Sequence, residues 1–120
     1  MSGKNAGGME SKTEVNTAMK ECCRKYLEEQ FAGDAGVMNE IHGEYISSMR
    51  AKVVEAGTAL ASGDWTLLDR IAHTVKGNAL SVGDAEMAET AIELRTTAEL
   101  KDVAASTALV ARLDGFSKEL

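Results

Sequence analysis

The stretch that decides the fold lies at residues 71–83 and reads IAHTVKGNALSVG. Placed on an α-helix at about 100° per residue, its apolar side chains fall within one narrow stripe. The stripe consists of Leu68 from the preceding turn, Ile71, Val75, Ala79 and Val82. Such a stripe turns one face of a helix toward a core. His73 points the opposite way, so the pattern predicts an imidazole that faces water.

Around His73, the helical wheel gathers residues that favour chemistry on the imidazole. Its neighbours, one turn before or after it, are Asp69, Lys76, Gly77 and Leu80. Gly77 costs the helix roughly 1 kcal/mol relative to alanine, and it lies away from the apolar stripe. The missing side chain clears room for a bulky group on the ring or for a loop of a partner. Lys76 can reach the same volume, and phosphoryl transfer needs mainly positioning and charge neutralisation. The pattern therefore predicts a phosphoryl-acceptor site.

The run from His73 to Gly83 resembles the signature of histidine-containing phosphotransfer (HPt) domains. That signature is His, any residue, an apolar residue, Lys, Gly, two small residues, two variable residues, an apolar residue and Gly. The resemblance extends from about Gly33 to the end of the chain, and it includes the turn at residues 63–65. Two departures are Asn78, where Ser or Ala is more usual, and Thr90, where Leu is common. Because Thr90 replaces the usual Leu, the sequence does not determine how the helix that contains it packs.

The resemblance implies a histidine phosphotransfer protein of a two-component phosphorelay. His73 would accept a phosphoryl group on Nε2 from an aspartyl phosphate of a receiver domain and pass it to the aspartate of another receiver. Lys76 would offset the charge of the phosphoryl group, and Gly77 would provide clearance. The residues expected to dock the partner are Asp69, Arg70 and Leu80. The implied partners are response-regulator receiver domains and a hybrid sensor histidine kinase.

Missing motifs limit what this chain is expected to do alone. The sequence has no GxxxxGK[ST] loop and no cluster of carboxylates suited to Mg²⁺. The chain is therefore expected to be a phosphohistidine carrier rather than an enzyme, with no cofactor or metal of its own. Mg²⁺ is expected on the partner receiver domain.

Three rival interpretations compete with the carrier. A helical adaptor would bind receiver or kinase domains without carrying phosphate. A small enzyme would use His73 as a general base with Asp69, which needs a concave pocket. A metal site at His73 lacks a second ligand at i+4.

Asp69 could also hydrogen-bond a ring nitrogen of His73 and bias the tautomer. His42 has no lysine one turn on, and is expected to lie on a helix surface or contribute to packing.

Composition narrows the class of protein further. The net charge of −6 over 120 residues argues against nucleic acid as a partner. No signal peptide or membrane-spanning run is visible, so a cytoplasmic protein is expected. It is also expected to be a monomer. The initiating Met1 favours a free-standing protein over a piece of a hybrid kinase. The adjacent Cys22 and Cys23 are expected to be free thiols. The cognate kinase, the regulator and the input signal are left open.

The periodicity predicts an all-α fold, namely an up-down antiparallel four-helix bundle with an additional N-terminal helix. Residues 1–10 are expected to form a flexible tail, and residues 11–120 the bundle domain. The expected helices span 13–31, 35–61 and 65–82, then run from Asp84 to the turn at 100–102, and on to the end. Ser11 and Glu14 have the spacing of a capping box for the first helix, with Asp64 and Asp84 as later N-caps. The apolar side expected for the first helix is Val15, Ala18, Met19, Cys22 and Tyr26.

Overall fold

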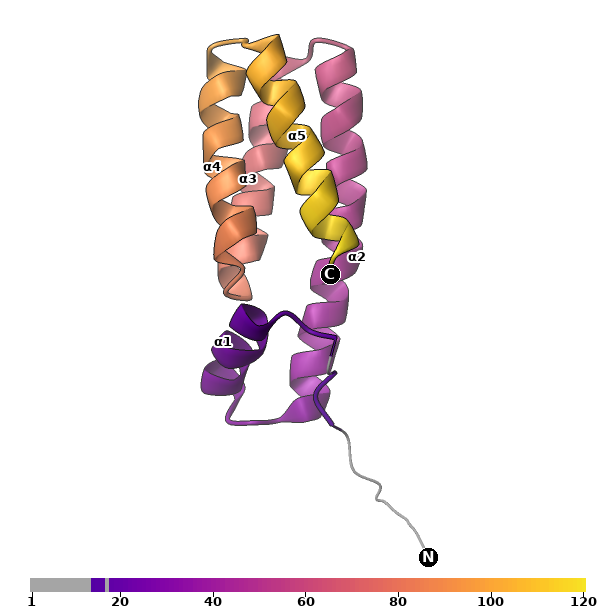
Figure 1. Cartoon of the computed structure of the whole chain (residues 1–120), viewed down its shortest axis with the longest axis vertical. Coiled ribbons are helices and arrows are strands. Elements are labelled where there is room, and N and C mark those ends of the chain that lie inside the picture. The colour runs from indigo at the N-terminus through magenta and orange to yellow at the C-terminus, as the bar shows by residue number, and fades with distance from the viewer. Residues whose placement is uncertain (1–13, 17) are drawn as a thin grey trace, which may run out of the picture.

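The computed structural model describes residues 14–16 and 18–120, and this part of the chain is helical without strands. Its helices are α1 (Glu21–Phe31), α2 (Ala35–Ala61), α3 (Trp65–Ser81), α4 (Ala85–Glu99) and α5 (Val103–Lys118). Helices α2 to α5 form an antiparallel bundle in which α3 packs against α2 and α4, and α5 closes the ring (Figure 1). The predicted all-α bundle with an additional N-terminal helix is confirmed. The tail predicted at residues 1–10 and the capping residue Ser11 lie outside the described residues.

The helices α2 to α5 begin in the same way. An aspartate precedes each of them, and its carboxylate accepts the backbone N–H three residues further on. These N-caps are Asp34, Asp64, Asp84 and Asp102. Each one satisfies a backbone donor that has no partner inside the helix. The predicted caps Asp64 and Asp84 are confirmed, and α3 ends one residue earlier than expected.

The first helix starts later than the predicted Thr13. Ahead of α1, the Asn16 side chain accepts the N–H of Ala18 at 2.9 Å. The Asn39 side chain of α2 accepts the N–H of Asn16 at 2.9 Å and donates to the carbonyl of Glu14 at 2.8 Å. Because side chains satisfy these backbone groups, the segment is held along α2 without forming a helical turn.

The buried side of the first segment agrees with the prediction at Met19, Val15 and Tyr26, which pack in or against the core, but not at Ala18 and Cys22. Cys22 is exposed, whereas Cys23 and Leu27 are buried together with Met19. Met19, Cys23 and Leu27 are four residues apart, so their side chains point toward the same side of α1 and of the turn that precedes it. Both thiols are free, as expected. Burial raises the pKa of Cys23 to about 12, so this thiol stays protonated and unreactive.

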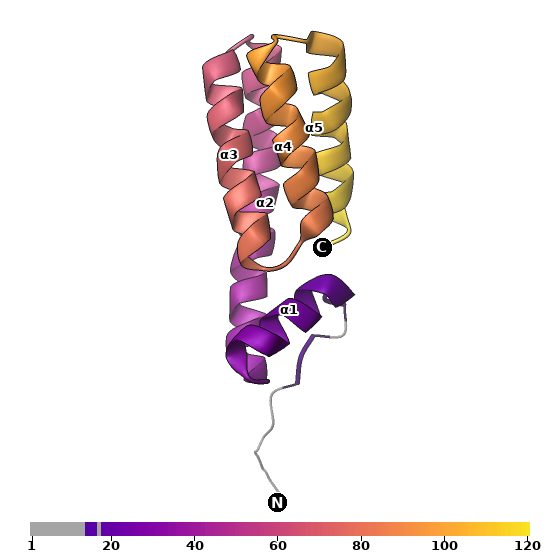
Figure 2. The ribbon, with the colours of Figure 1, turned by 90° about the vertical axis from the view of Figure 1, so that its left-hand side faces the viewer.

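Helix α1 lies across the end of the bundle, below the turn between α3 and α4 (Figure 2). Gly83 in that turn has a φ of 74°, which favours glycine. A Cβ at this position would lie 2.7 Å from Cγ of Tyr26 in α1. Glycine is therefore required both by the backbone of the turn and by the close approach of α1.

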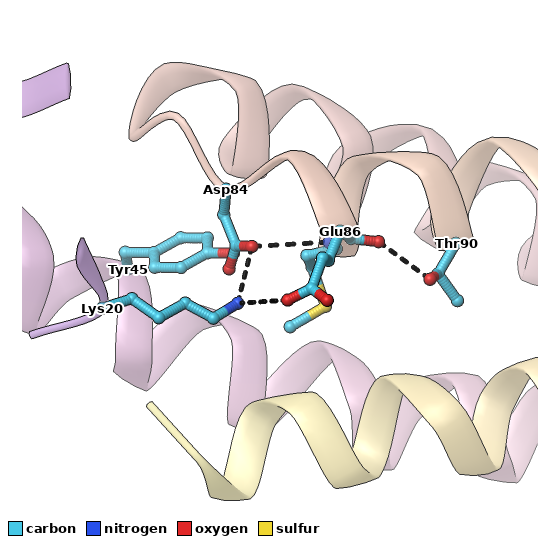
Figure 3. Close-up of polar contacts among 6 residues, drawn as sticks. Lys20, Tyr45, Asp84, Glu86 and Thr90 are labelled. Carbon is cyan, nitrogen blue, oxygen red and sulfur yellow. Dashed lines mark hydrogen bonds and ion pairs between the residues drawn. The ribbon is translucent and has the colours of Figure 1, made fainter. Parts of the chain in front are cut away.

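A buried carboxylate fastens α1 to the bundle (Figure 3). Asp84 is fully buried and accepts from Nζ of Lys20 at 2.8 Å and from the hydroxyl of Tyr45 at 2.7 Å. Burial and the Asp84 carboxylate raise the pKa of Tyr45, which keeps its hydroxyl as a donor. Lys20 also lies 5.5 Å from the ring centroid of Phe116 in α5. The cluster thus joins α1, α2, α4 and α5.

The sequence left open the placement of His42 and the packing of Thr90, and both side chains are buried in the bundle. His42 is buried against the core, so it contributes to packing, and its Nε2 has no hydrogen-bond partner among the described residues. Burial lowers the pKa of His42 and keeps the ring neutral. Thr90 is buried as well, and its hydroxyl donates to the carbonyl of Glu86 at 2.8 Å. Threonine therefore packs at this position of α4 without an unpaired hydroxyl.

Candidate functional site

His73 lies on the outer face of α3. The opposite face of the helix is buried, and its side chains are Leu68, Ile71, Ala72, Val75 and Ala79. The His73 side chain is exposed at the middle of this helix. The amphipathic stripe therefore turns the imidazole toward solvent, as the sequence predicts.

The surface one turn after His73 is open. Gly77 is exposed, and a Cβ built on it would meet nothing within 4 Å. Glycine is therefore not needed here for packing, and its absent side chain leaves space beside the ring. Lys76 is partly buried, and no ion pair engages it within the described residues.

A second cation, which the sequence analysis missed, contacts the ring directly. Arg95 of α4 places its Nη1 3.1 Å from Nδ1 of His73. Its Nε donates to Oδ1 of Asp69 at 3.0 Å. The hydrogen bond considered between Asp69 and His73 is not formed, and Arg95 bridges the two side chains instead. A general-base pair of His73 and Asp69 therefore lacks the hydrogen bond that it would need.

The register of the α3–α4 hairpin explains how Arg95 reaches His73. Both residues lie eleven positions from Asp84, which starts α4 just after the turn. In an antiparallel pair of helices, residues equally far from the turn lie at the same level. Reading the sequence outward from Asp84 in both directions gives the level of Arg95 along α3, whereas the packing of the two helices turns its side chain toward the imidazole.

A groove of about 630 Å³ runs between α3 and α4 next to this site. Residues from both helices and the following turn line it, among them Trp65, Asp69, Lys76, Ile92, Arg95 and Lys101. Trp65 also packs against the core. The groove thus combines apolar surface with three cationic side chains and the two carboxylates of Asp69 and Glu99.

The remaining residues singled out by the sequence surround the ring at greater distance. Arg70 is exposed, and Leu80 has 54% of its surface exposed. Asn78, a departure from the family pattern, donates from Nδ2 to Oγ of Ser48 at 3.0 Å. This bond ties α3 to α2, so Asn78 contributes to the packing of the two helices.

Neither a metal site nor a membrane helix is found in the described part of the chain. No group of three or more His, Cys, Asp or Glu side chains between residues 14 and 120, residue 17 aside, could hold a metal ion. None of the helices described combines the length and the apolar character needed to cross a membrane.

Comparison with known protein families matches residues 40–119 to the Hpt domain. Neither the curated proteins nor the solved structures gave a match. The matched range covers about two thirds of the chain and contains most of α2 and all of α3, α4 and α5. Hpt domains are phosphocarriers of two-component phosphorelays and are not catalytic kinase domains. The chain therefore belongs to the Hpt domain family, and its general function is histidine phosphotransfer in a phosphorelay.

Proposed function

We propose that this protein carries a phosphoryl group on His73 between the aspartates of receiver domains. The observation that carries the proposal is the exposed imidazole on the outer face of α3, inside the range that matches the Hpt domain. Arg95 contacts the ring, Lys76 lines the same groove as Arg95, and the open surface at Gly77 admits a tetrahedral group. His42, the other histidine of the chain, is buried and cannot meet a partner.

The transfer moves one phosphoryl group and needs no cofactor on this chain. The lone pair on Nε2 attacks the phosphorus of an aspartyl phosphate, the phosphorus–oxygen bond breaks, and the aspartate leaves as a carboxylate. The imidazole releases its ring proton to solvent. The reverse step delivers the group to the aspartate of a second receiver. In this proposal the receiver supplies the aspartate and Mg²⁺, while Lys76 offsets negative charge on the phosphoryl oxygens.

The proposed docking face surrounds the ring and consists of Asp69, Arg70 and Leu80. Leu80 offers apolar area next to charged side chains, an arrangement that suits a reversible protein contact. We propose receiver domains of response regulators and of a hybrid sensor histidine kinase as the partners. An adaptor that binds the same partners without carrying phosphate would use the same face, so transfer itself must be measured.

Incubation with candidate receivers bearing a radiolabelled aspartyl phosphate is expected to label this protein. The label should be lost in acid and retained in alkali, because a phosphoramidate hydrolyses once its ring is protonated, whereas an acyl phosphate is cleaved by base. Addition of a second, unlabelled receiver should remove the label from this chain. Binding of the receivers without any acid-labile label would support the adaptor and contradict the carrier.

Replacing Gly77 by leucine is expected to stabilise the protein and slow phosphoryl transfer. The helix gains up to about 1 kcal/mol from the better helix former, because nothing in the structure obstructs the new Cβ. The leucine side chain then fills the space beside His73 that a phosphoryl group or a partner needs. Transfer rates from a saturating receiver, together with urea unfolding, check both effects.

The matched control for this substitution is Gly115→Leu. Gly115 is also an exposed helical glycine with no atom near its Cβ, but it lies on α5, diagonal to α3. This variant should gain similar stability and transfer at the wild-type rate. Equal rates in both variants would show that the open surface at Gly77 has no role.

A further inference from the structure

The contact between Arg95 and His73 fixes which ring nitrogen carries the proton. A guanidinium has five N–H donors and no acceptor. Its Nη1 lies 3.1 Å from Nδ1 of His73, so Nδ1 must be the acceptor and must present its lone pair. In a neutral imidazole the proton then sits on Nε2. The structure thus assigns the resting ring to the Nε2–H tautomer.

Arg95 is held in place for this contact from the other side. Its Nε donates to Oδ1 of Asp69 at 3.0 Å, so one planar guanidinium faces a carboxylate and the imidazole at once. Asp69 lies one turn before His73 on the same helix, which sets the spacing of the two acceptors. Because the guanidinium fork is rigid, fixing Nε also orients Nη1 toward the ring.

This tautomer conflicts with phosphoryl transfer to Nε2. The attacking nitrogen needs its lone pair, but in the resting ring Nε2 carries the proton. For Nε2 to attack, the proton of the neutral ring must sit on Nδ1. In that attacking ring the Nδ1–H would face the N–H of Arg95, with no acceptor between them. Bond formation to phosphorus turns the ring into an imidazolium, which becomes neutral again by losing the Nδ1 proton, and Nδ1 can then accept from Arg95 once more.

We propose that Arg95 is a positioning residue that holds His73 in the resting tautomer, and that phosphorylation at Nε2 requires release of its hydrogen bond to Nδ1. The proposal rests on the function proposed above. Before attack, one proton leaves Nε2 for solvent and one is taken up at Nδ1, so the attacking ring is neutral. After the bond to phosphorus forms, the Nδ1 proton leaves for solvent, so the transfer as a whole releases one proton. The bond between Arg95 and Asp69 can persist through this change. It keeps the guanidinium next to the ring, where its freed N–H groups can meet the oxygens of the phosphoryl group.

Three variants of Arg95 separate this role from simple support of the fold. Arg95→Gln offers an amide oxygen that can accept from Nδ1–H, so it permits the reactive tautomer. Arg95→Lys retains a cationic donor without an acceptor. Arg95→Met keeps a long side chain but offers no hydrogen bond. Since Arg95 is partly exposed, all three variants should fold.

The tautomer is read directly by ¹⁵N NMR of the full-length protein labelled at histidine, in alkaline buffer and without phosphate. His73 is assigned by comparison with His42→Gln, which leaves His73 as the remaining histidine. The wild type and Arg95→Lys should show a protonated Nε2 and an unprotonated Nδ1. Arg95→Gln should shift the population toward Nδ1–H, with Arg95→Met between these limits. A wild-type ring protonated on Nδ1, or a tautomer indifferent to all three variants, would overturn the proposal.

Transfer kinetics give a second, separate measurement. Arg95→Gln should accept phosphate about tenfold faster at saturating receiver, which is the factor expected when one hydrogen bond to a charged donor no longer has to be released. Arg95→Lys should remain slow, and ³¹P NMR should place the phosphoryl group on Nε2. Slower transfer in Arg95→Gln, or a phosphoryl group on Nδ1, would count against the role of Arg95. If the tautomers behave as expected but no variant is ever phosphorylated, the carrier function fails while the assignment of the resting ring stands.

Discussion

His73→Gln is expected to abolish phosphorylation by a phosphorylated receiver, with no detectable acid-labile label. Glutamine has no nucleophilic nitrogen, so no phosphoramidate can form at residue 73. The side chain is exposed, so the free energy of unfolding should change by less than about 0.5 kcal/mol. The ion pair between Arg95 and Asp69 does not depend on the imidazole. Labelling and urea unfolding of the same preparation would separate loss of chemistry from loss of structure.

The control for this variant is His42→Gln, because the chain has two histidines. His42 is buried, and no receiver aspartate can reach it without unfolding the bundle. Its replacement should leave the label on every folded molecule, even if packing around residue 42 is weakened. Acid-labile label on His73→Gln would assign the phosphoryl group to a different residue and end the proposal for His73.

Asp84→Ala should cost about 3 to 5 kcal/mol of the free energy of unfolding, the largest loss expected from a single polar side chain here. The substitution removes an N-cap, an ion pair and a buried acceptor together. Lys20 can turn toward solvent or Glu86, but the hydroxyl of Tyr45 is left without its partner. Equilibrium unfolding in urea measures the loss, and circular dichroism reports whether helix content falls.

Asp64→Ala is the matched control, because Asp64 caps α3 as Asp84 caps α4. Its carboxylate accepts the N–H of Leu67 at 3.1 Å but is exposed, and no cation or hydroxyl of another helix bonds to it among the described residues. This variant should lose about 1 kcal/mol, the usual contribution of an N-cap. Equal losses at the two positions would show that the link from Asp84 to α1 and α2 adds nothing to stability.

Local sequence signals were sufficient for the bundle but insufficient for α1. Aspartates that cap helices act through backbone groups three residues away, so Asp64 and Asp84 could be recognised without knowing the fold. The start of α1 depends on Asn39, which lies in another helix and satisfies backbone groups of residues 14–16. The apolar periodicity of residues 13–31 does not reveal these hydrogen bonds to Asn39, so it could not predict where α1 begins.

In the candidate site, too, some features follow from the local sequence and others depend on how the helices pack. The outward direction of His73 follows from the phase of the apolar stripe in its own helix, and the open surface at Gly77 follows from its composition. Arg95 comes from the next helix, and its sequence neighbours give no sign of a role. Only the pairing of α3 with α4 brings it to Nδ1, so the tautomer of His73 is a property of the tertiary structure.

Every side chain proposed to take part in the chemistry sits within a single helical hairpin, α3 and α4. The reactive centre therefore depends on contacts that are short in sequence, and it can assemble before the chain ends have found their places. Residues 65–99 could therefore be transferred into a related bundle, and this segment would bring the imidazole of His73, the guanidinium of Arg95 and the carboxylate of Asp69 together. Stability could then change through α1, α2 and α5 without redesign of the chemistry.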